Sequence, residues 1–559
     1  MTENPLDDPF YYLNNFQQVI DWLELRYADV LSEDEQAFIG DFRRLPKASR
    51  ALLVRLVMRK GLHFRAGRLG YAEIGDTGAA AVPLLSLGWI DEQCPLTIHE
   101  LCAALLKSEI LEHLSHAIDQ PKATKSEWLA SLGERFNDAR TFRQWCPDLE
   151  DRLFSLTIMG LCDRLRLMFF GNLYQDWSEF VLADLGIFTY EKVEIDAQSR
   201  GLRHRRDVDA CVALHHCQLQ LEAGADMGEV VEQVHALPIG DNLWLARRRD
   251  KVLFQIGQQC ERMGDFANAL MIYHDCAYPG ARLRLIRVLE RVGETALALE
   301  LASAAQLVPQ SATETQALLR IVPRLQRRLG GPPVRRAAAR ALERLDLRVP
   351  RTDPLVSVEY YVQAHLDEAS APVHYVENSL INSLFGLLCW PAIFAPLPGA
   401  FFHPFQRGPV DLLSEDFHSR RAELFEACFA ELDDGRYRAT IRQRYAEKWA
   451  VQSPFVFWGA LSETLLEQAL DCLPATHLRL WFERLLLDIK ANRAGMPDLI
   501  QFWPQQKTYR MIEVKGPGDR LQDNQLRWIE FCQQHQMPVT VCYVQWLEDA
   551  AEQDLEQSA

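Results

Sequence analysis

Residues 495–516 read GMPDLIQFWPQQKTYRMIEVKG, and this stretch decides the fold of the last part of the chain. The run 498–503 is mostly apolar and predicts a strand, whereas the proline and polar residues of 504–507 predict a turn. The returning strand is predicted over 508–515, and the Gly-Pro-Gly sequence at 516–518 ends it. The stretch therefore predicts a β-hairpin.

Two further elements follow this hairpin. The spacing of apolar residues predicts a helix over about 521–535, and the run VTVCYV at 539–544 predicts a strand. The order strand, strand, helix, strand indicates an α/β domain with a central mixed sheet.

Three ionisable side chains occupy defined positions in the hairpin. Glu513 and Lys515 are two residues apart on one strand, so both point to the same face. Asp498 begins the neighbouring strand, and the hairpin folds it back beside Glu513. Two converging carboxylates repel each other unless a cation lies between them, and Mg²⁺ or Mn²⁺ with oxygen ligands meets that need. The Val514 carbonyl is expected to be a further ligand.

This pattern resembles the motif of PD-(D/E)xK nucleases, with Asp498, Glu513 and Lys515 as the catalytic residues. A bound metal would acidify a water molecule and neutralise the scissile phosphate, and Lys515 would orient the water or a non-bridging oxygen. The alternative is a strand whose Glu and Lys side chains only face solvent. The proline before Asp498, the turn and the Gly-Pro after Lys515 favour the nuclease interpretation.

The composition of the 559 residues is that of a globular protein, with 48% hydrophobic and 25% charged residues. No apolar run reaches the roughly 18–20 residues that a membrane helix needs, and the acidic N-terminus has no apolar signal core. The thirteen cysteines include no C-x-x-C pair, which favours reduced, buried thiols over a disulfide framework or a zinc finger. We therefore expect a cytoplasmic protein without membrane partners, or a nuclear one if the source is eukaryotic.

The net charge is −17, but basic residues are concentrated in two stretches. Between residues 43 and 68 no Asp or Glu occurs, and this absence of opposing charge favours contact with DNA phosphates. For the second stretch, residues 324–348, a solvated face is an equally good interpretation. The DNA-binding candidates of the first stretch are Arg50, Arg55, Arg59 and Lys60.

Helical periodicity dominates the chain before the hairpin region. Two similar segments contain Gly264 and Gly293, 29 residues apart, which is typical of shortened TPR-like helix pairs. Two short helices joined by a loop with Lys122 and Lys125 resemble a SAP module, a DNA-backbone binder, although an ordinary helical hairpin fits the same pattern. The expected domains are a helical N-terminal DNA-binding domain (1–95), the SAP-like module (96–140), TPR-like repeats (141–350), a linker within 350–372 and the nuclease domain (373–559).

A family resemblance covers nearly the whole chain. Residues 490–530, with KANRAGMPDL, EVKGPGDRL and QLRW, resemble the virus-type replication–repair (VRR) nuclease domain. The sequence YYLNNF near the N-terminus, the SAP-like module, the helical repeats and SLFGLLCW resemble, in this order, the Fanconi-anaemia-associated nuclease family. The chain is identified as a bacterial-type member, expected to lack the ubiquitin-binding zinc finger of animal forms.

The resemblance implies further site residues. Glu377, in the sequence VENS, would join the metal site of Asp498, Glu513 and Val514. Where the family has a lysine after the catalytic strand, this chain has Asn524. A basic pocket for a 5′-terminal phosphate would lie between the repeats and the nuclease domain, with DNA-binding candidates Arg247, Arg282, Lys490, Arg493 and Arg520.

The expected molecule is multidomain, with mostly α-helical N-terminal and TPR-like solenoid regions followed by an α/β PD-(D/E)xK nuclease domain. The resemblance implies a metal-dependent nuclease that cuts 5′ flaps of branched double-stranded DNA, degrades DNA 5′ to 3′ and acts in interstrand crosslink repair. Two alternatives remain: a junction-resolving or restriction-type nuclease, and a non-catalytic TPR scaffold. Intact Asp498, Glu513 and Lys515 argue against the scaffold, and the oligomeric state stays open.

Overall fold

The computed structural model describes residues 8–175, 177, 188–332, 342–351, 353 and 355–547, which fall into two compact units. The first unit comprises Met1–Phe188 and Ile195–His215, and the second comprises Thr189–Glu194 and His216–Ala559. Three arginines of the second basic stretch, Arg335, Arg336 and Arg340, lie outside the described residues. No helix within the described part of the chain is long and apolar enough to cross a membrane.

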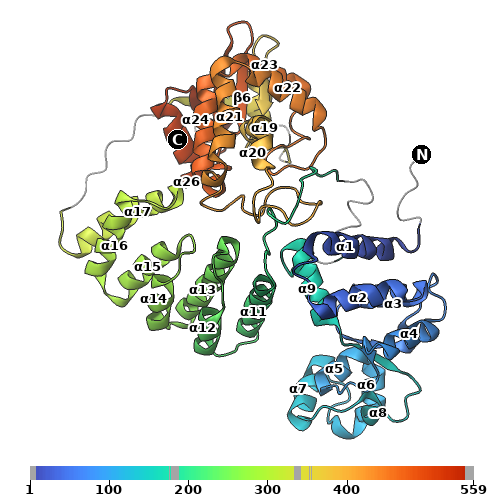
Figure 1. Ribbon diagram of the computed structural model, residues 1–559. Coiled ribbons are helices and arrows are strands. Elements are labelled where there is room, and N and C mark those ends of the chain that lie inside the picture. The colour runs from blue at the N-terminus through green and yellow to red at the C-terminus, as the bar shows by residue number, and fades with distance from the viewer. Residues whose placement is uncertain are drawn as a thin grey trace. The chain divides into compact units, whose positions relative to one another are not determined.

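The first unit is mostly helical (Figure 1). The helix after Ser32 begins with a capping box, because Ser32 Oγ accepts a hydrogen bond from Glu35 N, and Glu35 Oε2 accepts one from Ser32 N. The helices are α1 (Tyr11–Tyr27), α2 (Glu33–Arg44), α3 (Lys47–Val57), α4 (Thr77–Ser86), α5 (Ile98–Ala104), α6 (Lys107–Leu114), α7 (Lys125–Arg135), α8 (Phe142–Trp145) and α9 (Met159–Phe170).

The N-terminal region extends beyond the boundary at 140 that the sequence predicted. Strand β3 (Leu153–Leu156) pairs antiparallel with both β1 (His63–Arg65) and β2 (Ile90–Asp91), which lie about sixty or more residues earlier in the chain. In addition, Phe169 of α9 packs edge-on against Trp22 of α1, with ring centroids 5.1 Å apart. These long-range contacts, which local periodicity does not encode, place β3 and α9 with the N-terminal helices and not with the repeats.

The helical repeats form a row of antiparallel helices (Figure 1). Gly264 ends α13 with φ 79° and Gly293 ends α15 with φ 95°, so both glycines turn the chain in the left-handed conformation that favours this residue. The helix pairs predicted around these two glycines are therefore confirmed. The helices are α11 (Arg205–Glu222), α12 (Met227–Ala236), α13 (Leu243–Met263), α14 (Phe266–His274), α15 (Ala281–Val292), α16 (Thr295–Leu307) and α17 (Ala312–Arg328).

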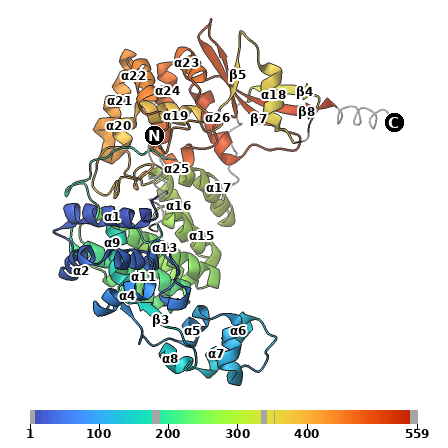
Figure 2. The same ribbon diagram turned by 90° about the vertical axis from the view of Figure 1, so that its right-hand side faces the viewer.

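A five-stranded mixed sheet of order β4-β8-β7-β6-β5 lies in the C-terminal domain, and Figure 2 labels its strands β4, β5, β7 and β8. β6 and β7 are the predicted hairpin, antiparallel with Leu499 opposite Ile512, and β8 runs parallel to β7. The predicted mixed sheet is confirmed. The strands are β4 (Arg344–Val349), β5 (Val373–Tyr375), β6 (Leu499–Trp503), β7 (Thr508–Lys515) and β8 (Val539–Trp546).

The C-terminal domain begins earlier than the predicted boundary at 373. β4 pairs in parallel with β8, nearly two hundred residues further along the chain, and the expected linker contains α18 (Val358–Leu366). Val362 of α18 packs with Ile512 and Val514 on one face of the sheet. A six-residue strand is recognisable only through its partner, and that partner is distant in sequence.

The remaining helices pack against the sheet and against each other. Every residue of α19 is buried, so this helix is the centre of the domain's helical part. These helices are α19 (Leu380–Leu388), α20 (Trp390–Ile393), α21 (Ala422–Asp434), α22 (Tyr437–Glu447), α23 (Glu463–Cys472), α24 (Ala475–Leu487), α25 (Ile489–Asn492) and α26 (Asp523–Gln534).

Candidate active site

A gap beside β7 precedes the first residue of β6, and Asp498 lies in this gap. Strand β6 begins at Leu499, opposite Ile512, so Val514 has no strand partner on that side. Instead, the Val514 N–H donates a hydrogen bond of 2.8 Å to Asp498 Oδ2. Because the N–H and C=O of one strand residue point to the same side, the Val514 carbonyl faces the same gap.

Glu513 and Lys515 lie on the face of β7 opposite the apolar core. Ile512 and Val514 alternate with them and pack in that core. Lys515 Nζ lies 2.8 Å from Glu513 Oε1. Glu513 is completely buried, Asp498 is 6% exposed and Lys515 is 7% exposed. The structure thus brings together the three residues that the sequence nominated as catalytic.

Burial makes this carboxylate pair unfavourable in its ionised form. Loss of solvation raises the pKa of Glu513 to about 8, and the neighbouring charge of Asp498 adds to that rise, while Lys515 opposes it. Loss of solvation also raises the pKa of Asp498 to about 6, against the lowering effect of the Val514 N–H. Apart from the ion pair between Oε1 and Lys515, neither Glu513 oxygen has a hydrogen-bond partner within the described residues. Two desolvated carboxylates and a carbonyl are hard oxygen donors that fit a divalent cation.

Glu377 lies at the margin of this group. It is exposed, Tyr375 Oη donates a hydrogen bond of 2.5 Å to its Oε2, and Asn378 Nδ2 donates one of 3.1 Å to its Oε1. Its charge nevertheless contributes to the raised pKa of both Asp498 and Glu513. Across the described ranges, no three or more His, Cys, Asp or Glu side chains gather closely enough to hold a metal ion. Glu377 is therefore near the carboxylate pair but engaged elsewhere.

Glu359 is a further carboxylate near the site that the sequence did not reveal. It lies at the start of α18, and its charge raises the pKa of Asp498 after burial, the dominant cause. Val358, the preceding residue, approaches Gly516 directly after Lys515. The sequence predicts a linker in this segment, and no motif marks Glu359. Only the folding of α18 onto the sheet brings Glu359 to the site.

The basic stretch of the first unit is largely paired with carboxylates from elsewhere in the chain. Arg55 donates to Glu73 and stacks over Tyr12, with its guanidinium carbon 3.8 Å from the ring centroid. Arg59 donates to Tyr71 Oη and is exposed, as is Lys60. Arg50 is half-buried. Arg43, Arg44, Arg65 and Arg68 also form ion pairs.

The helices α5 to α8 share a small core of their own, which includes Trp128 and Trp145. Lys125 is half-buried and its Nζ donates to the Leu105 carbonyl. Lys122 is exposed. Both lysines are DNA-binding candidates. Lys125 also joins the two helices of the hairpin through its hydrogen bond to Leu105, whereas Lys122 is accessible to a ligand.

The candidate phosphate-binding arginines of the repeats lie among carboxylates. Arg247 forms an ion pair with Asp416, and Arg282 donates to Glu314 at 2.8 Å. Glu415 interacts electrostatically with both arginines, so the two are neighbours. Among the other candidates, Lys490 and Arg520 are exposed, while Arg493 is half-buried, donates to the Pro454 carbonyl, and has a pKa lowered by burial and by Arg407.

Three family models match separate parts of the chain. The FAN1 HTH domain matches residues 10–91, the Fanconi anemia-associated nuclease SAP domain matches 95–145, and the VRR-NUC domain matches 432–546. The sequence resemblance to a SAP module and to a VRR nuclease domain is thereby confirmed.

Relatives match over nearly the whole of this chain. The chain is 55% identical to the Fanconi-associated nuclease 1 homolog of Pseudomonas aeruginosa over 541 residues, which is 97% of each chain. It is 24% identical to the homolog of Oryza sativa subsp. japonica, over 95% of this chain and 62% of that protein. The crystal structure of paFAN1 bound to 2nt 5′ flap DNA with a gap superimposes with a TM-score of 0.87 and 55% identity, covering 96% of this chain and 98% of that one.

Proposed function

Because the chain belongs to the Fanconi-associated nuclease 1 family, we propose that it cuts 5′ flaps of branched DNA, degrades DNA 5′ to 3′ and acts in interstrand crosslink repair, with Mg²⁺ or Mn²⁺ as cofactor. The family and its VRR-NUC domain make the chain a nuclease, and a divalent metal is general in that family. The observation that carries the proposal is the buried pair of Asp498 and Glu513 beside Lys515.

Asp498, Glu513 and the Val514 carbonyl would hold the cation, and Glu377 would join them after leaving Tyr375. When bound, the metal supplies Lewis acidity for the attacking water and for the scissile phosphate. The Val514 N–H fixes the Asp498 carboxylate in the gap that precedes β6. Lys515, now paired with Glu513, would direct its charge to the water or to a non-bridging oxygen.

The cut position is proposed to depend on a 5′-phosphate anchor. A terminal phosphate carries more negative charge than an internal diester, so a cluster of cations distinguishes the two. Arg247 and Arg282 lie near each other around Glu415, and Lys490 follows Asp488, which interacts with the same carboxylate. A bound phosphate would have to compete with Asp416 and Glu314 for these arginines. Arg493 and Arg520 complete the proposed set.

The test is a cleavage assay on DNA labelled at either end. The substrates are a 5′ flap with a 5′-phosphate, the same flap with a 5′-hydroxyl, a 3′ flap and a four-way junction, each with Mn²⁺, Mg²⁺ or EDTA. We expect cleavage of the 5′ flaps only when metal is present, faster and at a more uniform position with the phosphate. Arg247→Ala with Arg282→Ala should remove that preference and leave the cleavage itself.

Asp498→Asn is the inactive control, which should bind DNA and reduce cleavage by orders of magnitude. Preferential cutting of the four-way junction would favour the junction-resolving alternative. Cleavage by the Asp498→Asn protein at the parent rate would overturn the assignment of the site. Equal rates and positions on phosphorylated and unphosphorylated flaps would remove the phosphate anchor but not the flap nuclease.

A further inference from the structure

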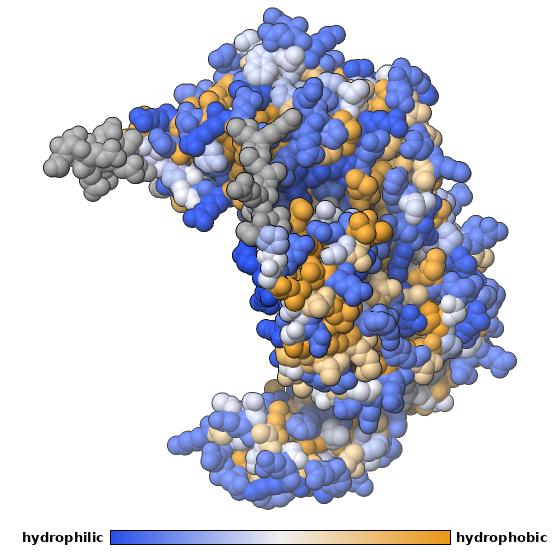
Figure 3. All heavy atoms as spheres, turned by 90° about the vertical axis from the view of Figure 1, so that its left-hand side faces the viewer, coloured by the Kyte–Doolittle hydropathy of each residue, from blue (hydrophilic) through white to orange (hydrophobic). Residues whose placement is uncertain are grey.

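Basic charge in the helical repeats is confined to alternate helices. α13 carries five Lys and Arg residues, and α15 and α17 carry four each. α14 and α16, which lie between them in sequence, carry none. Several of these side chains are paired with carboxylates, among them Arg282 with Glu314 and Arg324 with Glu290. The positive charge that remains therefore has to be judged cavity by cavity. Figure 3 shows one face of the molecule, with hydrophobic residues gathered in its middle part among hydrophilic ones.

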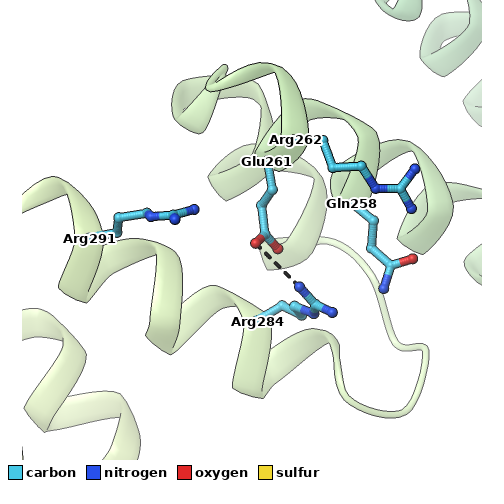
Figure 4. Close-up of a pocket in the computed structure, with 5 residues that line it drawn as sticks. All are labelled: Gln258, Glu261, Arg262, Arg284 and Arg291. Carbon is cyan, nitrogen blue, oxygen red and sulfur yellow. Dashed lines mark hydrogen bonds and ion pairs between the residues drawn. The ribbon is translucent and has the colours of Figure 1, made fainter.

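A positively charged pocket opens between α13 and α15. Its lining residues are Gln258, Glu261 and Arg262 of α13 and Arg284 and Arg291 of α15, around a volume of about 160 Å³ (Figure 4). The one carboxylate is already engaged: Glu261 accepts a hydrogen bond of 2.6 Å from Tyr273 Oη, and its Oε2 lies 3.4 Å from Arg284 Nη1. Three guanidinium groups against one carboxylate leave the pocket positive, which suits a phosphate group.

A second, mainly apolar hollow adjoins this pocket. It is lined by Phe254, Leu283, Ala317 and Ile321, with Gly280 and Arg287 also at its wall, and has a volume of about 220 Å³. Arg284 lines both cavities. The Phe254 ring packs against Tyr278 with centroids 5.0 Å apart, so the aromatic wall is held in place. A cationic pocket and an apolar hollow therefore meet at one arginine.

We propose that these adjoining cavities hold one nucleotide of single-stranded DNA, with its phosphate at Arg262, Arg284 and Arg291 and its base against Phe254, Leu283 and Ile321. Single-strand binding sites combine a basic groove with apolar or aromatic surfaces for the bases. The bases of a duplex are stacked inside the helix and cannot enter the hollow. Each cavity is smaller than the roughly 300–1,000 Å³ of a small-molecule site, which favours one unit of a polymer.

The inference rests on the proposed function, since it gives the single strand of a branched substrate a path along the repeats. The site is distinct from the proposed phosphate anchor, because Arg247 and Arg282 line neither cavity. It would add affinity for single strands without taking part in the cut.

The experiment measures binding by fluorescence anisotropy in the inactive Asp498→Asn background. The probes are a labelled 15-mer of thymidine, a 15-mer of the same length with abasic sites, and a 15-base-pair duplex. Arg262→Ala with Arg291→Ala tests the phosphate pocket, and Leu283→Gln tests the apolar hollow. The matched control, Arg436→Ala with Arg442→Ala, removes two charges from the nuclease domain. Circular dichroism and thermal melting verify that each variant folds.

We expect the double arginine variant to weaken binding of both single strands by about fivefold or more, and Leu283→Gln to weaken the thymidine strand but not the abasic one. The duplex and the control variant should show little change. Unchanged single-strand binding, or an equal loss for the duplex, would overturn the inference. Cleavage of a one-nucleotide flap by the unmutated protein is measured in parallel. Absence of cleavage would count against the proposed function, whereas the binding data would still decide whether the repeats bind single-stranded DNA.

Discussion

The surroundings of Glu513 oppose the ionised form of its carboxyl group. Its carboxylate is fully buried, and burial raises its pKa to about 8. In the unfolded chain an ordinary Glu titrates near pH 4.3. Between these two values the folded, metal-free protein keeps a proton that the unfolded chain has released. The free energy of unfolding therefore falls as pH rises through this window.

Replacing this residue should change the pH dependence of stability. In EDTA, we expect the melting temperature of the unmutated protein to fall between pH 5 and pH 8, and the fall to be smaller in Glu513→Gln, because the amide does not titrate. The difference in unfolding free energy should be on the order of a few kcal/mol. Adding Mn²⁺ at pH 8 should stabilise the unmutated protein more than the variant, because the metal binds the folded state.

The measurement is differential scanning fluorimetry across pH, with and without Mn²⁺. Because the charge of Asp498 raises the pKa of Glu513, the two carboxyls titrate as a coupled pair, and the comparison reports the loss of that pair. Identical pH slopes in the two proteins, together with equal stabilisation by Mn²⁺, would contradict the account of the site.

At the scale of the element, the loop before β6 depends on one glycine. Gly495 has φ 91°, and a Cβ at this position would lie 2.8 Å from the backbone carbonyl carbon of Asn524, near the start of α26. The turn places Asp498 directly before the first residue of β6. In this turn, Asn378 Oδ1 accepts a hydrogen bond of 3.1 Å from Met496 N. The loop is thus fixed by a close approach between two backbones.

Gly495→Ala should destabilise the protein more than Gly518→Ala does. Gly518 also has positive φ, 86°, but a Cβ there would meet nothing within 4 Å, so its substitution isolates the conformational cost. We expect that cost to be about 1 kcal/mol. The clash with Asn524 should add roughly 1–3 kcal/mol for Gly495→Ala. Urea unfolding measures both variants, and equal losses would show that the backbone of α26 yields without cost.

At the scale of the whole molecule, tertiary ion pairs redistribute the basic charge. The stretch from 43 to 68 has no acid of its own, yet Arg55 finds Glu73, and Arg65 finds Glu109 and Asp151. Arg59 and Lys60 remain exposed. The number of basic residues in a stretch of sequence is therefore a poor measure of the positive charge available to bind DNA phosphates.

Charge reversal of Arg59 and Lys60 should weaken binding to all DNA sequences alike. Contacts with phosphates release counterions, so losing two of them should flatten the plot of log affinity against log salt concentration by about 2. Arg55→Ala should instead lower thermal stability, because it removes an ion pair and the contact with Tyr12. Anisotropy titrations at several salt concentrations measure the first effect. A loss confined to one DNA sequence, or an unchanged salt slope, would count against phosphate contact here.

The sequence alone was enough to predict the hairpin of β6 and β7 and the positions of its three ionisable residues. Alternation along a strand and the turn between two strands are local properties, and they place Asp498, Glu513 and Lys515 together without knowledge of the rest. The helix pairs around Gly264 and Gly293 were also predictable, because a left-handed helix end favours glycine.

Only the tertiary structure decided what depends on partners distant in sequence. β4 is a strand because β8 pairs with it, and α18 brings Glu359 to Asp498 because its apolar side packs on the sheet. The hydrogen bond from Tyr375 to Glu377 belongs to the same class. The two cavities at Arg284 also depend on distant partners, because their walls come from α13, α15 and α17, which are separated in sequence by other helices. Strand pairing and side-chain packing stabilise contacts between two surfaces. A local sequence pattern describes only one of these two surfaces.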